Sequence, residues 1–236
     1  EISRFLPAEI VVNTMMYESA QEISKIRERF NIYISKLDDE KFDTDYNEFK
    51  IKYDILNENE QEVEDISDSV LCVAASNGLL NYLKDTQKSN LDYIHKIVLY
   101  YTTHYMNLDI NARRNLEITE KLRDKSKKGT LLWVLDKTST SMGGRLLRRW
   151  LNDPLIDVCK INERLEAVKE LKEDIILRGD VIDSLKKVYD IERLAGKISY
   201  GSANARDLLS LKNSAKQLPD VKKTLAQTKS PLLTQL

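Results

Sequence analysis

The sequence predicts a mixed α and β chain that is predominantly helical, with a partial α/β unit first and a helical domain after it. Apolar residues recur at helical spacing over most of the chain, whereas strand-like and helix-like segments alternate in the first third. Charge divides the chain as well: residues 1–86 hold 9 Lys and Arg against 19 Asp and Glu, and residues 87–236 hold 28 against 19. We therefore expect two domains, 1–86 (α/β) and 87–236 (mostly α).

The first domain is predicted from a strand–helix–strand–helix order. Residues 8–13 form a short apolar run typical of a buried strand, and residues 30–35 alternate apolar and polar side chains as a half-buried strand does. Helices are expected at 17–29 and 67–84, and Gly78 inside the second one predicts a close neighbour there. Four aromatic side chains at spacings of 4, 3 and 4 predict one further helix stripe, formed by Phe42, Tyr46, Phe49 and Tyr53.

The second domain is expected to begin with a small antiparallel sheet. Short strands are predicted at 94–101, 105–110 and 113–118, joined by tight turns. His95 and His104 fall in this region without a nearby cysteine, so we expect ordinary surface residues rather than a metal site.

The segment 131–155, LLWVLDKTSTSMGGRLLRRWLNDPL, predicts two short helices around a polar turn. The hydroxyls of residues 136–141 are candidate N-caps for the second helix, and the Asp-Pro pair ends it. Arg145, Arg148 and Arg149 occupy the polar half of that helix, where we expect arginines to pair with acidic neighbours. The Gly143–Gly144 pair in its first turn indicates either close packing or, as the weaker alternative, a bound anion.

Further helices are predicted to follow. An apolar stripe suited to packing on a neighbouring helix is formed by Val158, Ile161, Leu165, Val168 and Leu171. A later helix, capped by Ser202, is expected to end near Pro219.

Five blocks of this sequence, in order, resemble the MutS family of DNA mismatch-repair proteins. The blocks are GLLNYLKDTQKSNLDYI (78–94), LDINARRNLEIT (108–119), LDKTSTSMGGRLLRRWLNDPL (135–155), INERLEAVKEL (161–171) and ARDLLSLKNS (205–214). With their flanks they cover most of the chain after about residue 70. Five collinear blocks make the resemblance specific.

The resemblance implies that this segment is part of a larger, multidomain protein. Residues 1–86 correspond to the C-terminal part of a connector domain, with a non-catalytic ribonuclease H-like fold, and residues 87–236 to the first part of a core or lever domain. The implied function is to couple mismatched-DNA binding to an ATPase, with no chemistry within this segment. Because the chain opens at Glu1 and closes in apolar sequence, we expect a piece of a longer polypeptide.

Cofactors and partners follow from the same resemblance. No cofactor is expected in this segment, and ATP and Mg²⁺ are expected only in the full-length protein. The implied partners of that protein are mismatched double-stranded DNA, a MutL-type protein and a second copy in a homodimer, in the bacterial cytoplasm near the nucleoid. No membrane span is expected, because the longest apolar runs are far too short.

Catalytic and metal-binding residues are not predicted. The chain lacks a GxxxxGK[ST] phosphate loop and any grouping of serine, cysteine and histidine for nucleophilic catalysis. Cys72 and Cys159 are expected to be packed thiols in a reducing compartment. Residues that could ligate a nuclease metal by type only are Asp38, Asp39, Glu40, Glu62, Glu64 and Asp65, and a solvated loop is the favoured interpretation.

Two basic features could contact nucleic-acid phosphates. One is the stripe of Arg145, Arg148 and Arg149, for which pairing with acidic neighbours is favoured. The other is the dense basic run at residues 121–128. We interpret it first as a loop and second as a phosphate contact through Lys125, Lys127 and Lys128. An alternative function is a free-standing helical protein-interaction scaffold with an acidic adaptor domain. That alternative explains the composition but not the five ordered blocks, and a ribonuclease H-type nuclease is weaker still.

Overall fold

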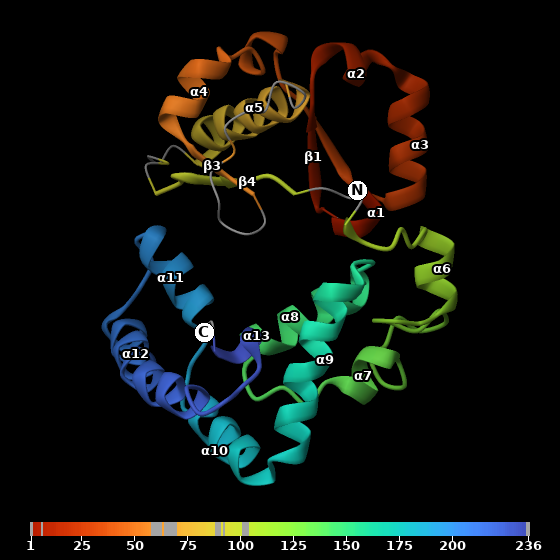
Figure 1. Ribbon diagram of the computed structural model, residues 1–236. Coiled ribbons are helices and arrows are strands. Elements are labelled where there is room, and N and C mark those ends of the chain that lie inside the picture. The colour runs from red at the N-terminus through yellow and green to blue at the C-terminus, as the bar shows by residue number, and fades with distance from the viewer. Residues whose placement is uncertain are drawn as a thin grey trace. The chain divides into compact units, whose positions relative to one another are not determined.

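The computed structural model describes residues 2–5, 7–57, 63, 70–87, 91, 93–100 and 104–234. The chain divides into two compact units, Glu1–Tyr101 (the first unit) and Thr102–Leu236 (the second unit). Helices dominate the described residues, and two small sheets accompany them (Figure 1). The predicted fold class, a predominantly helical mixture of α and β, is therefore confirmed.

The first unit alternates strands and helices, as its sequence pattern predicts. Its elements are α1 (Ile2–Phe5), β1 (Glu9–Val12), α2 (Thr14–Glu18), α3 (Ala20–Phe30), β2 (Tyr33–Lys36), the 3₁₀ turn η1 (Asp39–Lys41), α4 (Tyr46–Lys52), β3 (Asp54–Leu56), α5 (Val70–Gln87) and β4 (Lys96–Val98). Asn13 caps α2 by accepting a hydrogen bond from the Met16 backbone N–H at 3.0 Å, and Asp45 caps α4 in the same way.

Both sheets are parallel pairs, which corrects the predicted antiparallel sheet. β1 pairs with β2 in the register Glu9↔Tyr33, and β3 pairs with β4 in the register Asp54↔Lys96. A parallel pair needs a crossover connection rather than a tight turn. Helices α2 and α3 provide it for the first pair, and the connection containing α5 provides it for the second.

The strands predicted at 94–101, 105–110 and 113–118 are only partly present. The first shortens to β4, which belongs to the first unit through its pairing with β3. Of the second, only an isolated β-bridge between Tyr105 and Leu155 is present. Helix α6 (Ile110–Asn115) takes the place of the first half of the third strand, because the Asp109 carboxylate accepts the Ala112 backbone N–H at 2.6 Å and starts a helix there.

The core of the first unit brings Phe49 and Tyr53 of the predicted aromatic stripe against α5, although the predicted single helix is shorter, because α4 begins after Phe42 and ends before Tyr53. The buried side chains of this core are Phe49, Tyr53, Ile55, Val73, Leu80 and Leu91. Gly78 lies on α5 against the ring of Phe42, where an added Cβ would lie 2.4 Å from Cδ1. The close neighbour predicted for this glycine is thus confirmed.

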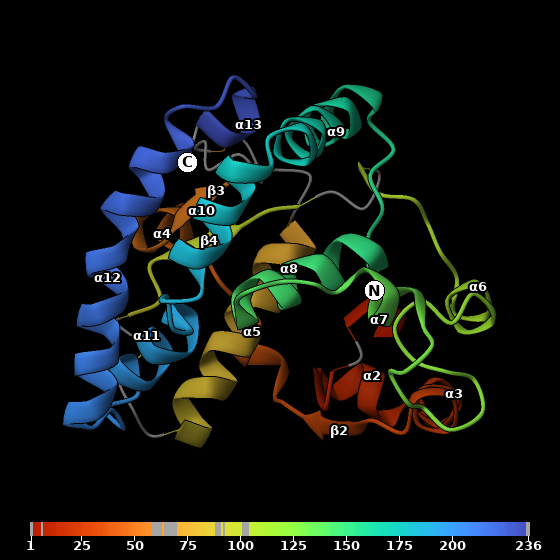
Figure 2. The ribbon, with the colours of Figure 1, turned by 90° about the horizontal axis from the view of Figure 1, so that it is seen from below.

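Within the residues described, the regular elements of the second unit are all helices, and one isolated β-bridge accompanies them. Its helices are α6, α7 (Leu131–Leu135), α8 (Ser141–Asn152), α9 (Val158–Glu173), α10 (Ile175–Leu185), α11 (Ile191–Ser199), α12 (Ala205–Leu225) and α13 (Pro231–Thr234). The long helix α12 runs alongside α10 and α11 (Figure 2). Leu177 and Val181 of α10 are buried against Leu225 of α12.

Two helix predictions in this unit need correction. Helix α12 continues past Pro219 to Leu225, and the cap is Asn204 rather than Ser202. The residues after the proline are held in the helix because Val221 and Leu225 pack against α10. The predicted α9 stripe is only partly packed, since Leu165 and Val168 are exposed.

Candidate functional site

The basic loop, residues 121–128, is closed by hydrogen bonds within itself. The Lys121 N–H donates to the Ser126 carbonyl at 3.0 Å, and the Lys125 N–H donates back to the Lys121 carbonyl at 3.2 Å. The Asp124 carboxylate accepts the Ser126 N–H at 3.0 Å and its hydroxyl at 2.8 Å. These bonds lower the pKa of Asp124. The loop therefore presents its cations from a defined backbone.

The three predicted phosphate-contact lysines differ in their surroundings. Lys125 forms an ion pair with Glu120 at 3.2 Å, and Lys127 forms one with Asp136 at 2.6 Å. The Lys127 hydrogen bond is the main reason why the pKa of Asp136 falls to about 2. Lys128 is exposed and forms no ion pair with a residue that the structure describes. Its charge is the most available of the three.

The polar turn before α8 explains the glycine pair. The Thr140 hydroxyl caps α8 by accepting the Gly143 N–H at 3.0 Å, and the Thr138 hydroxyl donates to Asp136 at 2.8 Å. An added Cβ would lie 3.1 Å from the Thr140 hydroxyl at position 143 and 3.3 Å from the Thr138 hydroxyl at position 144. The glycines are therefore packed closely by the threonines of their own turn.

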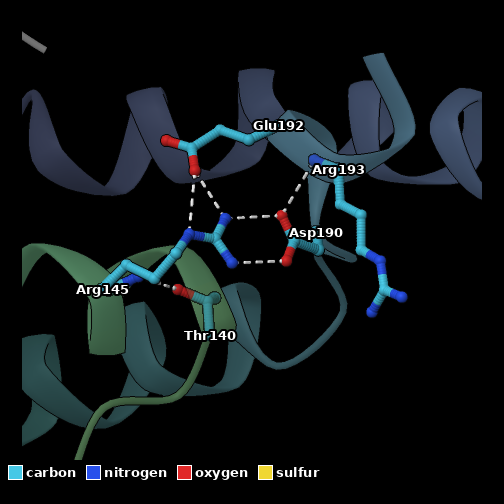
Figure 3. A network of polar contacts seen from close by, with 6 residues as sticks. Thr140, Arg145, Asp190, Glu192 and Arg193 are labelled. Atoms are coloured by element: carbon cyan, nitrogen blue, oxygen red, sulfur yellow. Dashed lines mark hydrogen bonds and ion pairs between the residues drawn. The ribbon is translucent and has the colours of Figure 1, made fainter. Parts of the chain in front are cut away.

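Arg145 connects α8 to the first turn of α11 (Figure 3). Its two terminal nitrogens donate to the two Asp190 carboxylate oxygens at 2.7 Å each, and its Nε donates to Glu192 at 3.1 Å. This arrangement, the Arg145 node, lowers the pKa of Asp190 to about 2 and raises that of Arg145. Asp190 also caps α11 by accepting the Arg193 N–H at 3.2 Å.

The other two arginines of the stripe remain available. Arg148 and Arg149 are exposed on α8 and form no ion pair with any residue in the described part of the chain. The expectation that stripe arginines pair with acidic neighbours is therefore confirmed for Arg145 alone.

A buried hydroxyl connects α12 to the segment between α10 and α11. Ser214 is fully buried, accepts the Tyr189 backbone N–H at 2.9 Å and donates to the Ser210 carbonyl at 2.9 Å. A backbone N–H that is shielded from water needs a partner, and here one buried side chain of α12 accepts the N–H of a residue outside that helix.

Charged groups make further connections between helices. The Glu170 carboxylate of α9 accepts the backbone N–H groups of Lys229 at 2.7 Å and Ser230 at 2.8 Å, just before α13. Lys197 of α11 donates to Asp207 of α12 at 2.9 Å. Segments distant in sequence are thereby held together by side chains as well as by apolar packing.

The C-terminal end of α8 is also anchored. Tyr105 forms a β-bridge with Leu155, and Arg113 lies 3.6 Å from the largely buried carboxylate of Asp153. In the last turn of α8, the Trp150 ring lies with its centre 3.8 Å from the Arg164 guanidinium of α9.

Sequence reasoning missed the acidic partners in this network. Asp190 and Glu192 are 45 and 47 residues from Arg145. The cap position of Asp190 is visible as an aspartate before an apolar-periodic segment, but its pairing with Arg145 has no local signal. The roles of Glu170 and Ser214 depend on tertiary packing in the same way.

The metal-site candidates that the structure describes do not converge on one another. No group of three or more His, Cys, Asp and Glu suited to a metal occurs among the described residues. Asp39 instead accepts the Thr14 backbone N–H at 2.9 Å, and Glu62, Glu64 and Asp65 lie outside the described residues.

Cysteines, histidines and hydropathy complete the survey. Cys72 and Cys159 are free and exposed, so the prediction of packed thiols was wrong. Their helices turn these positions toward solvent rather than toward the core. His95 and His104 are exposed, as predicted. None of the helices described is both long and apolar enough to cross a lipid bilayer.

Comparison with known proteins gives two successive family matches. The model for MutS domain II matches residues 1–95, and the model for MutS domain III matches residues 111–236. These ranges occupy the first and second units respectively, apart from short flanks.

Curated relatives agree with these matches. The DNA mismatch repair protein MutS of Ruminiclostridium cellulolyticum is 49% identical over 226 residues, covering 95% of this chain and 25% of the relative. The protein of that name from Alkaliphilus oremlandii is 47% identical over 242 residues, covering 100% and 27%. That from Clostridium botulinum strain Okra is 49% identical over 234 residues, covering 98% and 24%. The chain thus spans about a quarter of the length of these relatives. It belongs to the MutS family.

Proposed function

We propose that this chain is the connector and lever segment of a DNA mismatch-repair protein. In this proposal, residues 1–86 contribute to the connector and residues 87–236 to the lever. The segment couples the binding of mismatched DNA to an ATPase elsewhere in the full-length protein and carries out no chemistry itself. The observation that carries the proposal is the ordered match to MutS domains II and III over nearly the whole chain.

The internal connections of the second unit support a mechanical role. Coupling between distant sites needs elements that move as units and have more than one arrangement. Here α10 and α12 share an apolar core, the Ser214 hydroxyl links α12 to the α10–α11 segment, and Glu170 links α9 to the start of α13. A displacement at one end of such a bundle is transmitted because its packed interior resists deformation.

Loosening α12 without removing any contact tests the coupling. Lys212 and Lys216 are exposed on α12, so changing both to glycine weakens the helix by about 1 kcal/mol per site relative to alanine. The matched control changes both lysines to alanine. In the full-length protein, we expect the glycine variant to retain affinity for mismatched DNA and basal ATP hydrolysis but to lose the change in hydrolysis that mismatched DNA causes.

Hydrogen exchange on α12 confirms that the helix has been loosened. If the glycine variant exchanges faster in α12 and yet responds to mismatched DNA as the alanine variant does, the coupling proposal is wrong.

The proposal that the segment carries out no chemistry can be tested on the isolated chain. ATP and Mg²⁺ are proposed to bind the full-length protein outside this segment, since no phosphate loop occurs in the sequence. ATP hydrolysis by the 236-residue chain should therefore equal the buffer background, and turnover above it would reject this assignment. A MutL-type partner and a homodimer are likewise proposed for the full-length protein.

The basic loop is proposed to contact DNA phosphates through Lys125, Lys127 and Lys128. Exposed ion pairs contribute only about 0–1 kcal/mol, so the two paired lysines can exchange their carboxylates for phosphate, and Lys128 is available without exchange. Each lost contact should reduce the slope of log affinity against log salt by about 1.

The test changes the three lysines to glutamate in the full-length protein, with Lys216→Glu on α12 as the control. An unchanged affinity and salt slope for DNA in the triple variant would exclude a phosphate role for the basic loop.

A further inference from the structure

Helices α8 and α11 are joined in an unusual way within the second unit. The closely packed helix pairs of its described part are α10–α12, α11–α12, α9–α10, α9–α13 and α7–α8, and α8–α11 is not among them. The Arg145 node bridges this pair instead, with one guanidinium shared between Asp190 and Glu192 (Figure 3). The connection between these helices is therefore mainly ionic.

The exposure of the three charges determines how strong this connection is. The side chains of Arg145, Asp190 and Glu192 are 49%, 20% and 68% exposed. Ion pairs with this much contact with water are weak and are screened by salt. The bidentate geometry nevertheless fixes the orientation of the guanidinium against Asp190, because two parallel hydrogen bonds define one arrangement. The contact is thus specific in geometry but low in free energy.

We propose that the Arg145 node is a latch between two arms of the second unit. In the closed arrangement, the guanidinium holds α8 against the first turn of α11. In the open arrangement, the ion pairs are broken and α8 moves relative to α10–α12 while each helix stays folded. The purpose of the latch rests on the proposed lever function, since a coupling segment needs an element with two arrangements.

The two roles of Asp190 can be separated by substitution. Its carboxylate both caps α11 and binds Arg145. Asparagine is as good an N-cap as aspartate, so Asp190→Asn removes the charge while the start of the helix is retained. Glu192→Gln removes the second charge with little change in shape. The double variant therefore opens the latch with α11 intact.

Spin-label distances measure the latch directly in the 236-residue chain. Labels are placed on α8 and α12 through Arg149→Cys and Lys216→Cys, both exposed positions, with the native cysteines changed to serine. At low salt the parent should give one narrow distance population. In 1 M salt, where the screening length falls to about 3 Å, a second population should appear.

The variants provide the matched comparison. In Asp190→Asn/Glu192→Gln, the closed-to-open ratio at low salt should fall about fivefold, the size of a weak ion-pair contribution, and should no longer depend on salt. Arg148→Gln removes an arginine of α8 outside the node and should behave as the parent does.

A parent distribution that is the same at low and high salt, and is matched by the double variant, would overturn the latch. The salt titration of the parent needs no node variant, so a folding defect in the double variant cannot hide the answer. The measurement uses neither DNA nor ATP. Its failure would therefore leave the coupling test on α12 unaffected, and a failure of coupling would leave the latch intact.

Discussion

Replacing Ser214 with alanine should destabilise the second unit measurably, although only one oxygen atom is removed. The Ser214 hydroxyl is fully buried and is the partner of the Tyr189 backbone N–H at 2.9 Å. Alanine leaves that N–H without an acceptor, directed at a side-chain position that is fully buried. The second bond matters less, because the Ser210 carbonyl lies within α12 and can still accept the helical N–H four residues later.

The expected magnitude follows from the unsatisfied donor. Leaving one buried polar group without a partner costs about 1–3 kcal/mol. For a chain of this size, that corresponds to a fall in melting temperature of roughly 2–12 °C. Ser210→Ala is the matched control, since its hydroxyl bonds only the Arg206 carbonyl on the exposed side of α12 at 3.0 Å. We expect little change in stability for this control.

Tryptophan fluorescence reports the effect in the correct unit. The chain has 2 tryptophans, Trp133 and Trp150, and both belong to the second unit. Denaturant unfolding followed by their emission therefore measures this unit even if the first unfolds separately. If Ser214→Ala and Ser210→Ala unfold at the same denaturant concentration as the parent, the bond to Tyr189 contributes nothing and the argument fails.

Further predictions concern two glycines and one carboxylate. Gly78→Ala should destabilise the first unit by about 1–3 kcal/mol, because its Cβ would lie 2.4 Å from the Phe42 ring; faster hydrogen exchange in α5 is the readout, and unchanged exchange would contradict it. Gly179→Ala on α10 meets no atom within 4 Å and should stabilise the second unit by up to about 1 kcal/mol, measured by tryptophan fluorescence, where a loss of stability would contradict the reasoning. Arg145 lowers the pKa of Asp190 to about 2, so the stabilisation is present above the unfolded pKa of about 4 and is lost as the pH falls toward the folded value. Between these pH values, the free energy of unfolding should therefore depend less on pH in Asp190→Asn than in the parent chain. If both depend on pH equally, the Arg145 node does not cause the pH dependence.

Local signals predicted the helices around the polar turn well. The caps at Thr130 and Thr140 act on backbone N–H groups three residues away, so sequence alone contains both partners. The same holds for the end of α8 before Pro154, where the proline acts on its immediate neighbour.

The sheets and the long-range polar contacts could not be predicted in this way. Strands β3 and β4 are only three residues each, and their pairing joins Asp54 to Lys96 across α5. A short strand was predicted at residues 113–118, yet the local cap at Asp109 favours a helix there. At Pro219 a local rule was overridden because burial of Leu225 against α10 compensates for a lost hydrogen bond.

The Glu170 carboxylate has a consequence for how force would pass through the second unit. It joins α9 to the residues before α13 across 59 and 60 positions of sequence. Tension applied to α13 would therefore enter α9 through two hydrogen bonds, without first travelling back along α12 and α10. The two hydrogen bonds thus connect the beginning and the end of the helical segment between α9 and α13. A force applied to α13 would therefore reach α9 directly.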